Sequence, residues 1–142
     1  PERTISTLVA GFRQFTDRIP AAHQHWRHEQ GTPCALCALL LADCYDNAVA
    51  VQFLNRSFDG AISLGGVAAA VAPFSHSTAS NFGLVWERRA DTVGELDRMA
   101  SLQNAHAEYL RAIEIASGEG NIGALAFYEK HRDRVAASLR LS

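Results

Sequence analysis

The sequence contains no apolar run long enough to cross a membrane. The run that begins at Cys34 stops at Asp43, which is less than half of the roughly 20 residues that a membrane span requires. The chain also lacks an excess of either charge, because 13 Lys and Arg residues oppose 15 Asp and Glu residues and leave a net charge of −2. Such a chain has no electrostatic reason to bind nucleic acid or an anionic membrane. We therefore expect a soluble protein without a membrane partner, which would contact DNA only through a domain that is not present in this chain.

Cysteine is scarce, with three residues in the whole chain. Cys34, Cys37 and Cys44 are odd in number and lie in or just after an apolar run, which is typical of reduced thiols in a core and not of a disulfide framework. No segment has the pattern of a signal peptide. We therefore expect a cytoplasmic protein, with a metal or redox role for the closely spaced Cys34 and Cys37 as the alternative.

The motifs of several common enzyme classes are absent. There is no phosphate-binding loop, no dinucleotide fingerprint, no nucleophile elbow and no zinc-protease helix. The tripeptide Ser75-His76-Ser77 has the residue types of a nucleophile and a base, but the sequence shows no acidic partner for them. These absences favour a binding domain over an enzyme.

Apolar residues recur at helical spacing through the chain, and no segment shows the alternation of a strand. With 142 residues and a hydrophobic fraction of 48%, the chain is long enough for one domain with one core. We therefore predict an all-α fold, an antiparallel bundle of about six or seven helices that forms a single domain over residues 1–142.

Start and stop signals predict where several helices lie. Two helices are expected within residues 5–30, and Thr32-Pro33 begins a third that continues as one long helix to Gly60. The Ala- and Gly-rich segment from Ala61 to Val71 is expected to be a kinked helix or a closely packed segment.

Further along the chain, residues from Ser75 to Asn81 are expected to form a loop. Ser80 would then cap a helix that begins near Phe82 and is interrupted around Asp91.

Two histidines occupy a predicted helical hairpin between Ala105 and Val135. The Gly-rich segment from Ser117 to Gly120 separates its two helices, with His106 expected near the start of the first and His131 near the end of the second. Adjacent antiparallel helices would bring these histidines to one end of the hairpin, which is a plausible place for a ligand.

Two further polar residues extend this predicted site. Asn55 and Asp59 are expected four positions apart on one face of the long helix. With His106 and His131 they would form a ligand or metal site, in which Asp59, His106 and His131 suit zinc, nickel or manganese. The alternative is that His106 is an exposed residue near a helix start and that His131 is a cation that complements the dipole at a helix C-terminus.

Two segments resemble the FCD ligand-binding domain of GntR-type transcription regulators. LNRSFDGAI, from Leu54 to Ile62, resembles the ligand-bearing helix of that family, and AHAEYLRAIEIASGEGNIGALAFYEKH, from Ala105 to His131, resembles its closing hairpin. The resemblance implies an all-helical bundle that holds a metal and a small carboxylate effector. Carried over by position, the metal ligands of the family fall on Asn55, Asp59, His106 and His131, with an amide in place of the family's Asp and a carboxylate in place of its first His.

The expected function is therefore that of a small-ligand-binding effector or sensor domain in transcription regulation, with a small-molecule effector as partner and the chain itself as a homodimer. Two alternatives stay open. One is a metal-binding protein or catalyst of the hemerythrin-like bundle type, which would use His23, His25 and His28, with the cysteines as further candidates. The other is a helical interaction module without a small ligand, in which Ala61 to Ala72 would pack against a partner.

Overall fold

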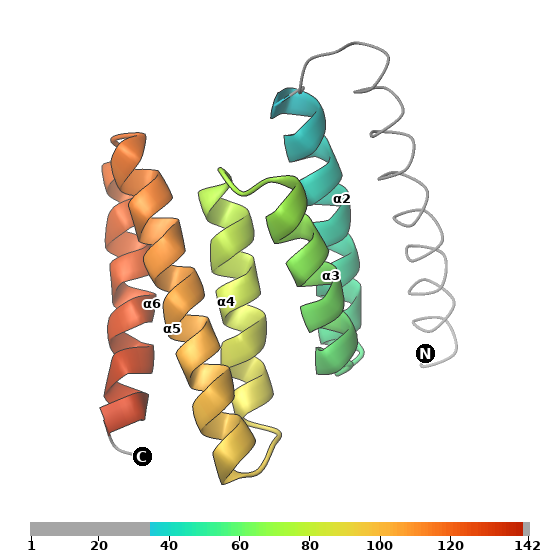
Figure 1. The fold of residues 1–142 in the computed structure, drawn as a ribbon, viewed down its shortest axis with the longest axis vertical. Coiled ribbons are helices and arrows are strands. Elements are labelled where there is room, and N and C mark those ends of the chain that lie inside the picture. Colours follow the sequence, from blue (N-terminus) through green and yellow to red (C-terminus); the bar gives the residue numbers. More distant parts are fainter. Residues whose placement is uncertain (1–34, 141–142) are drawn as a thin grey trace. The chain divides into compact units, whose positions relative to one another are not determined.

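The computed structural model describes residues 35–140, and side chains from residue 38 onward. These residues form five α-helices and no strand (Figure 1). The helices are α2 (Ala35–Leu54), α3 (Phe58–Val71), α4 (His76–Ala90), α5 (Glu95–Gly118) and α6 (Ile122–Arg140). The predicted all-α class is thereby confirmed, although the described part does not reach the expected six or seven helices. The predictions for His23, His25, His28 and Cys34 lie outside the described residues, as does the side chain of Cys37, whereas Cys44 is half-buried.

The described residues divide into two compact units, one within Pro1–Ala72 and the other within Pro73–Ser142. In the first unit, α2 and α3 pack against each other as an antiparallel hairpin. The inner face of α3 consists mainly of small residues, including Ala61, Gly65 and Ala68, so its backbone can approach α2 closely. The segment from Ala61 to Val71 therefore lies within one helix, which continues through its paired glycines.

The turn between α2 and α3 corrects the prediction of one long helix up to Gly60. Arg56 adopts a left-handed backbone with φ 58°, although it is not glycine. The amide of Ser57 donates to the carbonyl of Gln52 at 2.9 Å, and the amide of Arg56 donates to that of Phe53 at 3.0 Å. This pattern is a Schellman motif, which ends α2 and reverses the chain. Because the left-handed position is not occupied by the usual glycine, this turn could not be predicted from the local sequence.

The start of α4 also differs from the prediction. The helix begins at His76, where the expected loop should have been, and the side chain of Ser75 caps it by accepting a hydrogen bond from the amide of Thr78 at 3.3 Å. Thr78, Ala79 and Ser80 are buried within the helix, so packing outweighs the low helix propensity of this polar segment. The end of α4 at Ala90 agrees with the interruption expected near Asp91.

The break between α5 and α6 lies where the sequence predicted it. Gly120 has a left-handed backbone with φ 70°, and the amide of Asn121 donates to the carbonyl of Ala116 at 2.9 Å in a second Schellman motif. The side chain of Asn121 then caps α6 by accepting from the amide of Ala124 at 3.1 Å.

Both predictions for the histidine positions in the hairpin are wrong. The first helix begins at Glu95 and the second continues to Arg140, so His106 and His131 lie in the middle of their helices. His131 is therefore not a cation at a helix C-terminus, and the two histidines do not mark one end of the hairpin.

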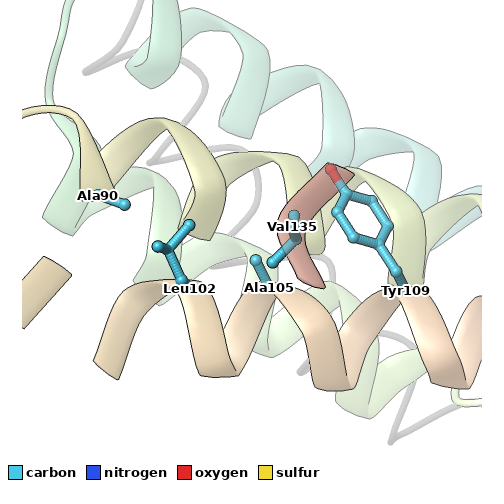
Figure 2. Packing of buried hydrophobic residues seen from close by; sticks show 5 residues of the cluster. All are labelled: Ala90, Leu102, Ala105, Tyr109 and Val135. Carbon is cyan, nitrogen blue, oxygen red and sulfur yellow. The ribbon is translucent and has the colours of Figure 1, made fainter. Parts of the chain in front are cut away.

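Alanine and tyrosine side chains dominate the core of the second unit. One buried cluster joins Ala90 of α4, Leu102, Ala105 and Tyr109 of α5, and Val135 of α6 (Figure 2). A second cluster contains Ala79, Ala112, Ala116 and Tyr128. The small residues leave room for the two tyrosine rings, and the ring of Tyr109 lies against Gly83 of α4.

The contact between Gly83 and Tyr109 leads to a test of the packing. A Cβ atom at position 83 would lie 3.0 Å from Cε1 and 3.1 Å from Cδ1 of the Tyr109 ring, which is fully buried and has little room to move. We expect Gly83→Ala to lower the free energy of unfolding by about 1–3 kcal/mol through overpacking, in spite of the better helix propensity of alanine. Urea denaturation measures the change.

Gly118→Ala is the matched control, because Gly118 also lies in a helix and nothing is within 4 Å of a Cβ atom built there. It should leave the stability unchanged or raise it slightly. Equal stability of the two variants would contradict the described fit of Tyr109 against α4.

Candidate functional site

Four polar side chains from all three helices of the second unit meet in one group, which we call the Glu87 cluster: Glu87 of α4, Tyr109 of α5, and His131 and Arg134 of α6. Arg134 donates from Nε to Oε1 of Glu87 at 2.7 Å and from Nη2 to Oε2 at 2.9 Å. The hydroxyl of Tyr109 donates to Oε2 of Glu87 at 2.8 Å. A carboxylate from one helix is therefore held by donors from the other two.

The ring of His131 has aromatic neighbours on α5 and α6. It stacks on the ring of Tyr109 with 5.2 Å between the centroids and an interplanar angle of 15°. Phe127, one turn earlier in α6, meets it edge to face at a centroid distance of 4.3 Å. Because His131 and Arg134 are three positions apart, both lie on the face of α6 that meets the cluster.

The protonation states in the cluster follow from these contacts. Burial by itself would raise the pKa of Glu87, but hydrogen bonds from Arg134 and Tyr109 and the positive charge of Arg134 lower it below its ordinary value. Burial, together with the charge of Glu87 and the hydrogen bond to it, raises the pKa of Tyr109 above its usual range. Glu87 is consequently an anion and the Tyr109 hydroxyl a donor at neutral pH.

The contact between Arg134 and His131 determines which ring nitrogen of His131 carries a proton. Nη2 of Arg134 lies 2.5 Å from Nδ1 of His131, and a guanidinium can only donate. Nδ1 must therefore accept, which leaves the proton on Nε2. Burial, followed by the positive charge of Arg134, lowers the pKa of His131 and favours the same neutral form. In this arrangement Nε2 is a hydrogen-bond donor, a role that differs from metal ligation.

A second polar group, the His76 cluster, consists of His76, Glu119 and Tyr128. Nδ1 of His76 is hydrogen-bonded to the Tyr128 hydroxyl at 2.6 Å, and Nε2 lies 3.6 Å from Oε2 of Glu119. Glu119 is thus an acidic partner for His76 that the sequence did not reveal. His76 nevertheless contacts Tyr128 and not a serine. The Ser75 hydroxyl caps α4 and lies 3.2 Å from the Ser77 hydroxyl. Burial raises the pKa of Tyr128, so its hydroxyl is not an activated nucleophile.

The structure distributes the four residues of the predicted site over two units. Asn55 lies in the turn after α2 and Asp59 is exposed in the first turn of α3, so these two do not share a helix face as predicted. His106 is half-buried on α5, one turn before Tyr109, and His131 belongs to the Glu87 cluster. Among the side chains that the structure describes, from residue 38 to residue 140, no three of His, Cys, Asp or Glu are grouped so that they could hold a metal ion.

Sequence reasoning therefore found one member of the Glu87 cluster and missed three. The spacing of His131 and Arg134 was a visible pattern, because residues three apart share a helix face. Glu87 is 47 positions from Arg134, and nothing in the local sequence connects them.

Comparisons with protein-family models, curated proteins and solved structures found no match to the chain. Within residues 35–140, none of the helices combines the length and the apolar character that a membrane crossing requires.

The lowered pKa of Glu87 predicts how the stability depends on pH. Because its folded-state pKa lies below the ordinary 4.5, the Glu87 carboxylate stabilises the fold fully above pH 4.5 and loses this effect as the pH falls through the folded-state pKa. We expect Glu87→Gln to cost about 1–3 kcal/mol at neutral pH and progressively less in acid. Urea denaturation of both proteins from neutral to acidic pH measures the difference.

Glu129→Gln is the control, since Glu129 is an exposed residue of α6. Its effect on stability should be small at every pH. A difference between wild type and Glu87→Gln that stays constant into acid would contradict the described role of the Glu87 carboxylate.

Proposed function

We propose that the chain is a small-ligand-binding effector or sensor domain, and that its ligand is a small carboxylate bound at Arg134 and His131. The resemblance to the FCD domain motivates the class of function. The Glu87 cluster is the basis for three further parts of the proposal: the type of ligand, the position of the site and the helix that responds to binding.

One observation carries the choice of ligand: Arg134 already binds a carboxylate, that of Glu87, through two hydrogen bonds, one to each oxygen. The planar fork of an arginine is suited to this two-pronged recognition. The Arg134 side chain is 45% exposed, whereas that of Glu87 is 16% exposed, so a molecule in solution can reach the arginine. The proton on Nε2 of His131 supplies a further donor for a ligand oxygen.

The positions of Glu87 and Arg134 suggest how the domain would respond to ligand binding. Glu87 belongs to α4 and Arg134 to α6, so a ligand that engages Arg134 changes the link between these helices. An effector acts only if it binds two arrangements with different affinity. In this proposal the two arrangements differ in the position of α6. The chain works as a homodimer, and a further domain binds DNA.

Ligand binding can be tested with succinate and citrate as probes in isothermal titration calorimetry. We expect the wild type to bind at least one of them, and we expect Arg134→Gln to weaken binding by about tenfold or more, because it removes the charged fork. His131→Ala should weaken binding less.

Arg88→Gln is the control, because Arg88 is an exposed arginine of α4 that pairs with Asp91 at 4.0 Å. It should bind like the wild type. Absence of binding by the wild type, or an equal loss in Arg134→Gln and Arg88→Gln, would contradict the proposed site.

The resemblance alone supports a second proposal, a divalent metal that has His106 and His131 among its ligands. If it is correct, native mass spectrometry and elemental analysis of the protein purified without a tag should find one zinc, nickel or manganese ion per chain. The ion should be lost in His106→Ala and in His131→Ala but retained in His76→Ala. A metal-free wild type would contradict this proposal and leave the carboxylate site untouched.

A further inference from the structure

We infer that Glu87 is a built-in competitor for the ligand of Arg134, so that the domain's own carboxylate occupies the site until a ligand displaces it. This inference rests on the proposed function and adds its regulation.

A guanidinium group offers two edges for two-pronged binding, one made by Nε and Nη2 and the other by Nη1 and Nη2. Glu87 occupies the first edge through Nε and Nη2. Nη2 also contacts Nδ1 of His131, which blocks the second edge. A carboxylate can therefore bind Arg134 with both oxygens only if it displaces Glu87 or His131.

Displacement of Glu87 is the favoured exchange. The carboxylate that leaves keeps a partner, because the Tyr109 hydroxyl also donates to Oε2 of Glu87 at 2.8 Å. The arginine exchanges one carboxylate for another, so its own charge stays neutralised, while Glu87 gives up its cation at a cost that the ligand must offset. His131 meanwhile stays stacked on Tyr109 and keeps its contact with Nη2 of Arg134.

The exchange has a structural consequence. The ion pair of Glu87 and Arg134 connects α4 to α6 across 47 positions of sequence. The ligand would break this ion pair but leave Glu87 hydrogen-bonded to Tyr109 of α5. The ligand's apparent affinity is then its intrinsic affinity multiplied by the fraction of molecules in which Glu87 does not hold Arg134.

The test is the affinity for succinate, measured by isothermal titration calorimetry on the wild type, Glu87→Gln and Glu108→Gln. Glutamine keeps the size of the side chain and its capacity to bond Tyr109, but it competes poorly for the arginine. We expect the dissociation constant to fall about tenfold in Glu87→Gln, within the usual range for coupled equilibria. It should not change in Glu108→Gln, because Glu108 is a half-buried acid of α5 that pairs with Arg111 at 3.4 Å.

A second readout separates displacement from a general change of charge. In the wild type, saturating succinate should shift the NMR signal of the Arg134 Nε–H group, because its acceptor changes from Glu87 to the ligand. Equal affinity in the wild type and Glu87→Gln, or weaker binding in Glu87→Gln, would overturn the inference and leave the proposed function standing. Failure of all three proteins to bind succinate and citrate would overturn the proposed function itself.

Discussion

The second unit depends on the burial of Tyr109. Its ring is fully buried on α5, lies against Gly83 of α4 and stacks on His131 of α6. A buried hydroxyl must have a hydrogen-bond partner, since leaving it unpaired costs about 1–3 kcal/mol. Glu87 provides that partner, and its own negative charge in turn needs a cation. One large aromatic residue in an alanine-rich core therefore requires the carboxylate and, through it, the arginine.

The same contacts explain why these charges are stable where they lie. Glu87 is mostly shielded from solvent and accepts three hydrogen bonds, whereas Arg134 is nearly half exposed and keeps part of its hydration. A pair of this kind avoids most of the desolvation cost of a fully buried ion pair. The pair also lets a long side chain of α6 reach α4, and the bond between His76 and Tyr128 joins the same two helices.

By resemblance to the FCD domain, His131 occupies the position of a metal ligand. Its contacts in the structure favour a different role. Arg134 donates to Nδ1, so the imidazole is neutral with its proton on Nε2. A ligated histidine instead presents a free electron pair to the metal and donates its other N–H group to a neighbouring acceptor. An arginine cannot serve as that acceptor. The observed surroundings of His131 suit the donation of a hydrogen bond to an oxygen atom better than they suit metal ligation.

What the sequence determined by itself was local. Helical periodicity predicted the all-α class, and Ser117 to Gly120 predicted the break between α5 and α6, because glycine occupies the left-handed position of the turn at little cost. The same reasoning missed the turn at Arg56, where a non-glycine residue adopts that conformation, and the start of α4, where burial of Thr78 and Ser80 outweighs their propensity. It predicted His131 as a site residue but not its partners. Only the tertiary structure decided these points, because the packing of three helices around one tyrosine brings Glu87 to Arg134, and no pattern within a single helix contains that information.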